Sequence, residues 1–285
     1  MTTELDRLLA QIKSESARSV AGLAPPPPKH TTVYTGVEAL DDALREIYET
    51  DESSGPLLEL LGLAGSGKTH TAYHICATIA LNGQSVLFID IDGKASAHTL
   101  AHHIKSRVKS IEQVAEALRL VHIFTPSTTQ SLIATLAMLP QYVQRHDLSI
   151  GLLVLDGLGC NYWADRKESV HVRLRSKRAT AFFRLQQLFV DTLQMVHRRL
   201  GCLTVATSLL LLPVLDSQED GRVIGNEYRD HMIQRWSSVV SRSFLIDSRA
   251  DGNALSRVTF TPVGSQKAGL YTAYVDQNGL YTNTG

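Results

Sequence analysis

Residues 62–69 read Gly62-Leu63-Ala64-Gly65-Ser66-Gly67-Lys68-Thr69 and fit the pattern G-x-x-x-x-G-K-[ST]. The glycines of this pattern allow a tight turn that aims backbone N–H groups at phosphate oxygens. The apolar run 57–61 before the turn indicates a strand, and the apolar spacing in 73–81 after it indicates a helix. Because a helix that begins at such a turn adds its positive N-terminal end to the site, the stretch predicts a binding site for a nucleoside triphosphate.

Two side chains of this phosphate loop have specific predicted roles. We expect Lys68 to contact the β and γ phosphates, and the Thr69 hydroxyl to hold Mg²⁺. The alternative interpretation, a glycine-rich turn that only leads into a helix, is disfavoured by the strand before it and the helix after it. The predicted residues for ATP and Mg²⁺ are Gly62, Gly65, Ser66, Gly67, Lys68 and Thr69, together with Asp156 from a later strand.

Composition limits the class of protein. The 285 residues are 44% hydrophobic and carry a formal net charge of zero, so a large core is possible and any contact with nucleic acid must come from a local patch. The odd number of cysteines, at no metal-ligand spacing, predicts buried free thiols in a reducing compartment; they are Cys76, Cys160 and Cys202. We expect a soluble intracellular protein, because no run of 18 apolar residues and no signal-like N-terminus is present.

The pattern of apolar runs predicts the fold class. Near-continuous apolar strands that alternate with segments long enough for helices indicate an α/β fold, with a mainly parallel sheet covered by helices on both faces. These runs are 57–61, 86–89, 120–124, 150–155 and 203–206. After residue 240, shorter runs and the turn signal Asn278-Gly279 predict a C-terminal antiparallel β extension.

The N-terminal segment differs from the rest of the chain. Residues 1–35 combine a helical apolar pattern with four consecutive prolines, Pro25 to Pro28, and predict a short helix on a semi-rigid tether. Residues 36–285 are predicted to form one ATP-binding domain. It begins with a helix over 37–47.

Two of the predicted strands end in acidic residues. Asp156 follows the run 150–155, an arrangement that places a carboxylate near the Mg²⁺ of phosphate-loop proteins. At least two strands separate the loop from Asp156 in sequence, which leaves room for a strand inserted between them in the sheet. The run 86–89 leads into Asp90 and Asp92. Each acid also has a purely structural interpretation. Asp156 would then only open the next turn, and Asp92 would cap a helix that starts near Ala95.

Several of these segments together resemble the RecA-like recombinase paralogues of homologous recombination. The resemblance covers residues 33–282, and the segment Asn161-Tyr-Trp-Ala-Asp-Arg166 is similar to a small member of the family that lacks an N-terminal DNA-binding domain. It rests on segments 35–44, 62–69, 87–92 and 152–158 and on Arg235-Trp236. It implies a RecA-like fold and a nuclear, membrane-free protein that binds ATP. It also implies a complex with another recombinase paralogue at damaged single-stranded or branched DNA.

The resemblance makes Asp92 the candidate catalytic base, because a carboxylate at the end of this strand orients the attacking water in RecA-like ATPases. Aspartate stands here in place of the family's usual glutamate. A base must lie within hydrogen-bond reach of the proton that it takes, and aspartate is one methylene shorter. We therefore expect a weakened base and slow or negligible ATP hydrolysis.

Two further departures concern assembly and phosphate sensing. The strand end at which recombinases place Asn-Gln to sense the γ-phosphate reads Thr207-Ser208-Leu209, and leucine cannot hydrogen-bond a phosphate. The Phe-x-x-Ala segment that joins recombinase subunits is also missing upstream of the core, since Phe88 is the first phenylalanine in the chain. Filament formation by that route is not expected.

A basic stretch follows the second acidic strand. Its DNA-binding candidates are Arg173, Arg175, Lys177 and Arg178, beside Arg166 and Lys167, in the region of the first DNA-facing loop of RecA-like proteins. The alternative is a solvated helix face. Core packing is the favoured interpretation for Tyr162 and Trp163, with base or partner stacking as the other. Residues 212–228 read as an acidic loop, and the histidine pairs 70/74 and 102/103 lack further metal ligands.

The sequence thus predicts an ATP-binding accessory recombinase paralogue with weak or no hydrolysis. Three other hypotheses remain: a competent DNA-dependent ATPase, a small-molecule kinase, and a scaffold whose nucleotide site is vestigial. Leu209 argues against the first, and the β-rich C-terminal part argues against the second. Nucleotide titration against thermal stability separates the third.

Overall fold

The computed structural model describes residues 33–50, 55–171, 175–210, 232–250, 256–263, 271–276 and 279–282. Most of the predicted N-terminal helix and tether (1–35) and the acidic loop 212–228 therefore lie outside the described residues. The strands are β1 (Leu57–Gly62), β2 (Ser85–Asp90), β3 (Val121–Phe124), β4 (Ile150–Leu158), β5 (Leu203–Leu209), β6 (Arg242–Ala250), β7 (Ser256–Pro262), β8 (Tyr271–Asp276) and β9 (Gly279–Thr282).

The helices fill the intervals between the strands, as the apolar pattern predicts. The sequence places a helix directly after the phosphate loop and another over 37–47, and the structure has both. The helices are α2 (Glu38–Thr50), α3 (Lys68–Leu81), α4 (Ala97–Lys105), α5 (Ile111–Arg119), α6 (Thr129–Arg145), α7 (Tyr162–His171), α8 (Arg175–Leu200) and α9 (Gln234–Ser237).

The described strands form a single sheet in the order β3-β2-β4-β5-β1-β6-β7-β8-β9. The pairs from β3 to β6 are parallel, and the pairs from β6 to β9 are antiparallel. This confirms the predicted α/β class and its antiparallel extension, with one refinement: β6 still pairs in parallel with β1, so the extension begins at β7. The strand inserted between β1 and β4 is β5.

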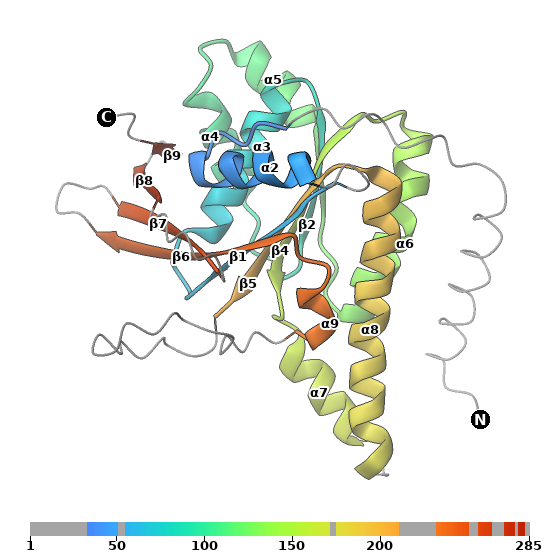
Figure 1. The fold of residues 1–285 in the computed structure, drawn as a ribbon. Coiled ribbons are helices and arrows are strands. Elements are labelled where there is room, and N and C mark those ends of the chain that lie inside the picture. The colour runs from blue at the N-terminus through green and yellow to red at the C-terminus, as the bar shows by residue number, and fades with distance from the viewer. Residues whose placement is uncertain are drawn as a thin grey trace, which may run out of the picture.

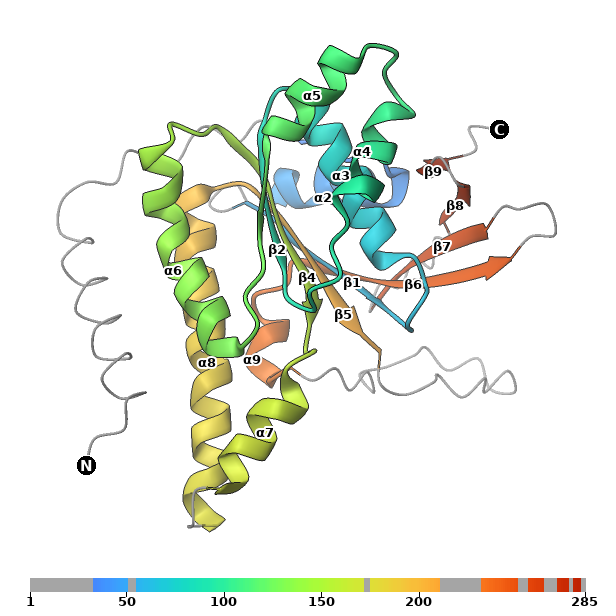
Figure 2. The same ribbon diagram turned by 180° about the vertical axis from the view of Figure 1, so that it is seen from behind.

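Helices cover both faces of the sheet (Figures 1 and 2), and each face has its own apolar core. Alternate residues of one strand belong to different cores: Phe88 of β2 packs under α2–α5, whereas Leu87 and Ile89 pack under α6, α8 and α9. This alternation follows from the two-residue period of a strand. It explains why strands buried on both faces are apolar throughout.

Helices α7 and α8 extend past the edge of the sheet as a two-helix projection (Figures 1 and 2). Among the described side chains of α8, the buried apolar ones lie in its second half and include Phe189, Val190, Leu193 and Val196. The interpretation of Trp163 as a core residue is wrong, because its residue surface is 65% exposed. Near the start of this projection Cys160 is exposed, so the prediction of a buried thiol is wrong there, while Cys76 and Cys202 are buried and free as predicted. Across the described residues, no helix has the length and apolarity needed to cross a membrane.

Candidate nucleotide site

The phosphate loop connects the carboxyl end of β1 to the first turn of α3. Gly65 and Gly67 have φ angles of 79° and 92°, in the left-handed region that glycine enters without a steric penalty. At Gly62 a Cβ atom would lie 2.4 Å from the Ser66 hydroxyl oxygen and 2.5 Å from the Ile246 carbonyl oxygen, so a side chain does not fit. The glycine pattern of the sequence is thus required by the backbone of this loop.

The ammonium group of Lys68 folds back onto the loop. Its Nζ donates to the carbonyl oxygens of Gly62, at 2.9 Å, and of Leu63, at 2.7 Å. Burial lowers the pKa of Lys68, and nearby Asp156 opposes that effect. Phosphate oxygens are stronger acceptors for an ammonium group than neutral carbonyls, so the loop holds a cation that favours an anionic ligand.

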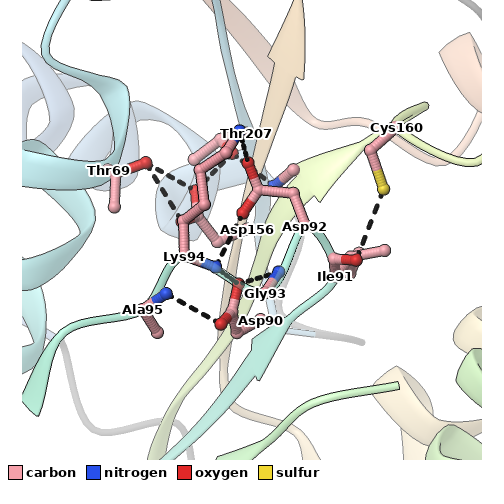
Figure 3. A network of polar contacts seen from close by, with 11 residues as sticks. Thr69, Asp90, Ile91, Asp92, Gly93, Lys94, Ala95, Asp156, Cys160 and Thr207 are labelled. Atoms are coloured by element: carbon pink, nitrogen blue, oxygen red, sulfur yellow. Dashed lines mark hydrogen bonds and ion pairs between the residues drawn. The ribbon is translucent and has the colours of Figure 1, made fainter. Parts of the chain in front are cut away.

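Thr69 and Asp156 meet although they lie 87 residues apart in sequence. The Thr69 hydroxyl lies 3.1 Å from Oδ1 and 3.0 Å from Oδ2 of Asp156 (Figure 3). Burial raises the pKa of Asp156, while hydrogen bonds from Thr207 and Thr69 lower it. A hydroxyl and a carboxylate beside a phosphate loop are the oxygen ligands that Mg²⁺ takes in such sites, so these residues fit the predicted metal.

Thr207 is a site residue that the sequence analysis missed. Its hydroxyl donates to Asp156 Oδ1 at 2.6 Å and accepts from the Gly157 backbone N–H at 2.8 Å. The triplet at 207–209 was assessed only for its missing amide. The contact becomes visible only once β5 is known to lie beside β4, which brings Thr207 next to the carboxylate.

The acid that ends β2, Asp90, and the acid that follows the strand, Asp92, have different environments. Asp90 is buried and accepts backbone hydrogen bonds from Gly93, Lys94 and Ala95, so it shapes the turn that follows the strand. The interpretation of Asp92 as the helix cap is wrong, because the Ser96 side chain caps α4 by accepting from the Thr99 N–H. The Asp92 side chain is 25% exposed and forms an ion pair with Lys94, with 2.7 Å between Oδ2 and Nζ.

The carboxylates of Asp90, Asp92 and Asp156 converge, with ligand oxygens that all lie within 4.8 Å of one another. Within the described residues this is the one group of three or more potential ligands. A Cβ atom built on Gly157 would approach the Asp92 Cβ to 3.1 Å, which shows how closely the end of β4 packs against the turn after β2. The carboxyl ends of β2 and β4 therefore form an acidic wall of the nucleotide site, beside the first turn of α3.

A buried carboxylate supports β1 behind the loop. Glu59 is 4% exposed and accepts hydrogen bonds from three neutral donors: Ser208 Oγ at 3.0 Å, Trp236 Nε1 at 2.7 Å and Ser243 Oγ at 2.9 Å. Burial raises the pKa of Glu59, and these bonds oppose the shift. This network is not predictable from the sequence, since a single acid in an apolar run carries no information about distant donors.

The end of β5 contacts the phosphate loop directly. The Leu210 N–H donates to the Gly62 carbonyl oxygen at 3.0 Å, the same oxygen that accepts from Lys68. Leu209, the residue before it, is 44% exposed. The position at which the family has an amide thus lies beside the loop and offers an apolar side chain.

The predicted DNA-binding residues are only partly accessible to structural description. Arg173 lies outside the described residues, and the side chains of Arg175, Lys177 and Arg178 on α8 are likewise outside them. Nearby, Arg166 lies 5.8 Å from the centroid of the Tyr162 ring and 5.7 Å from that of Trp163. Phe183 on α8 is 55% exposed.

The loop, the Thr69–Asp156 pair and the inserted strand define a phosphate-loop nucleotide-binding protein with a RecA-like fold. A family model described as the CobQ/CobB/MinD/ParA nucleotide binding domain matches residues 62–254, more than half of the chain. The chain belongs to this family of nucleotide-binding domains.

Known proteins also share sequence and fold with this chain. DNA repair protein XRCC2 from Mus musculus is 32% identical over 127 residues, which cover 41% of this chain and 45% of that protein. The match thus spans less than half the length of this curated relative. A crystal structure of the RadB recombinase matches 88% of this chain and 99% of its own, with a TM-score of 0.61 and 18% identity. The predicted resemblance to RecA-like recombinase paralogues is confirmed.

Proposed function

We propose that this protein binds ATP with Mg²⁺ and acts as an accessory recombinase paralogue in DNA repair by homologous recombination. In this proposal it works in the nucleus within a hetero-complex of paralogues, and it hydrolyses ATP weakly or not at all. The observation that carries the proposal is the contrast within one pocket. The residues for binding phosphate and metal are complete, whereas those for activating water are altered.

The binding part of the proposal rests on the geometry of Lys68, Thr69 and Asp156. Lys68 would exchange its two carbonyl acceptors for oxygens of the β and γ phosphates, and the loop N–H groups would bind the same anion. Thr69 and Asp156 would hold Mg²⁺, which supplies charge neutralisation for the phosphates. Thr207 keeps Asp156 oriented through its 2.6 Å hydrogen bond.

The catalytic part rests on Asp92 and the end of β5. Hydrolysis requires a group that accepts a proton from the water attacking the γ-phosphate, and Asp92 is the candidate. It is a shorter side chain than glutamate, and its carboxylate is engaged by Lys94. Leu209 supplies no amide for the γ-phosphate. We infer that ATP serves mainly as a ligand that stabilises the fold or a partner interface.

The α7–α8 projection supports a contact with single-stranded DNA. Exposed aromatic rings at Trp163 and Phe183, with Arg166 over the neighbouring ring, are features of surfaces that stack bases and neutralise phosphates. The basic candidates Arg173 and Arg175 belong to the same stretch of chain. Charge reversal of both should weaken binding to single-stranded DNA and flatten its salt dependence. Unchanged binding would remove this stretch from the proposal.

Two measurements test the proposed function. Copurification from cells followed by mass spectrometry should recover another recombinase paralogue. ATP turnover by the purified protein, with and without single-stranded DNA, should be slow. Turnover of several per second with DNA stimulation would contradict the accessory role and favour a competent DNA-dependent ATPase.

A further inference from the structure

Lys94 is a charged residue beside Asp92, and the proposed function uses only the fact that it engages that carboxylate. It lies in the turn between β2 and α4 and contacts both oxygens of the Asp92 carboxylate (Figure 3). Its Nζ donates to Oδ2 at 2.7 Å, and its backbone N–H donates to Oδ1 at 3.3 Å. One residue thus binds the candidate base twice.

The turn fixes where Lys94 can reach. Asp90 accepts the backbone N–H groups of Gly93, Lys94 and Ala95, and Gly93 adopts a φ of 73° that favours glycine. These bonds hold the Lys94 backbone directly above the strand end, so its side chain can close back onto Asp92. The contact between Lys94 and Asp92 therefore follows from the turn itself.

We propose that Lys94 is a positioning residue that restrains Asp92 and keeps the pocket slow in ATP hydrolysis. The inference rests on the proposed function, since it assumes that ATP binds and that Asp92 faces the attacking water. The two Lys94 donors occupy one acceptor site on each oxygen of the Asp92 carboxylate and fix its orientation. The attacking water must then bind at a remaining acceptor site or displace a donor.

The restraint is partial, because the Lys94 side chain is 80% exposed. Ion pairs at such exposed positions are weak and exchange with water. Removing the ammonium should therefore raise the hydrolysis rate modestly, by about twofold to fivefold. The restraint adds to the effects of the short Asp92 side chain and of Leu209.

The first test compares ATP hydrolysis by three variants. Lys94→Met should raise kcat with little change in KM. Lys94→Arg preserves a cation that can bind the carboxylate, so its kcat should stay below that of Lys94→Met. Lys105→Met is the matched control, because Lys105 is an exposed lysine on α4 outside the pocket, and it should behave as wild type.

The double variant Asp92→Asn/Lys94→Met should lose the increase in kcat. An unchanged or lower kcat in Lys94→Met, including no detectable hydrolysis in either protein, overturns the proposal.

The second test needs no turnover. Amine-reactive labelling of nucleotide-free protein, read by mass spectrometry, should modify Lys94 more slowly in wild type than in Asp92→Asn, with Lys105 unchanged in both. Equal labelling of Lys94 would show that the restraint does not exist in solution. A measurement of MgATP binding by the same proteins distinguishes a failure of this inference from a failure of the proposed function. If the wild-type protein does not bind MgATP, the proposed function is wrong. If it binds MgATP and Lys94→Met does not change kcat, only this inference is wrong.

Discussion

The two walls of the nucleotide pocket differ in how closely they follow the pattern of their fold. The phosphate-loop wall, from Gly62 to Thr69, has every glycine, the lysine and the hydroxyl that the pattern requires. The other wall, formed by the ends of β2, β4 and β5, keeps Asp156 for the metal but has a shortened and ion-paired acid at Asp92 and an exposed leucine at the sensing position. Binding and hydrolysis thus depend on different residues, and one can be kept while the other weakens.

The largest expected effect is on MgATP affinity and comes from a substitution in the phosphate loop. Lys68→Ala removes the cation that faces the β and γ phosphates, and the affinity for MgATP should fall on the order of a hundredfold. Titration with a fluorescent ATP analogue measures it, and Lys105→Ala serves as the charge-matched control. Equal affinities for the two variants would mean that the triphosphate does not sit on this loop.

A smaller effect on MgATP affinity is expected at Thr207, which orients Asp156. Thr207→Val keeps the shape of the side chain but removes the hydroxyl that orients Asp156 and accepts from Gly157. Leaving buried partners unsatisfied should lower the free energy of unfolding by about 1–3 kcal/mol, and MgATP should bind more weakly. Denaturant unfolding gives the first value. Thr99→Val, on α4 away from the pocket, should change neither quantity.

The next prediction concerns the pH dependence of stability that the buried Glu59 of β1 causes. Because burial raises the folded pKa of Glu59 above its unfolded value, the folded protein binds more protons than the unfolded chain. Stability from this residue is then present below the unfolded pKa and lost as the pH rises through the folded pKa. One pKa unit corresponds to about 1.4 kcal/mol.

Glu59→Gln should remove this loss, because glutamine keeps an oxygen for the Ser208 and Trp236 donors and carries no charge. The difference in unfolding free energy between the variant and wild type should increase from pH 4 to pH 7 in favour of the variant. A difference that is constant with pH would mean that the pKa of Glu59 is the same in the folded and the unfolded protein.

The smallest expected effect tests the sensing position. Leu209→Gln restores an amide beside the phosphate loop, yet Asp92 remains short and bound by Lys94. The rate of ATP hydrolysis should rise by at most about threefold. A much larger rise would show that the missing amide, and not the state of Asp92, limits hydrolysis.

The sequence was sufficient to predict the central sheet. Apolar runs such as 86–89 and 150–155 are buried on both faces, and that burial leaves a pattern that needs no tertiary information. The phosphate loop was equally predictable, because its backbone geometry demands glycine at fixed spacings. The parallel pairing of β6 with β1 was not predicted, since a strand's partner depends on the topology and leaves little trace in its composition.

The other wall of the pocket was predictable only in part. Asp92 and Asp156 were found because each follows an apolar run, but Thr207 and Lys94 were assigned no role. A threonine hydroxyl or a surface lysine becomes part of a site only when another strand or turn places a carboxylate beside it. Trp163 shows the converse, because an aromatic residue next to a buried strand was predicted to be core and lies exposed on the α7–α8 projection.

The central claim is that a triphosphate binds at Lys68 and stabilises the protein. Thermal unfolding with Mg²⁺ alone and with Mg²⁺ plus ATP at about a hundred times its dissociation constant tests it most directly. A ligand at that concentration adds about 2.7 kcal/mol to the free energy of unfolding. The account predicts a rise in Tm of at least about 5 °C for wild type and only about 1 °C for Lys68→Ala, whose weaker site is about half filled at that concentration. Identical curves with and without ATP for wild type would contradict it.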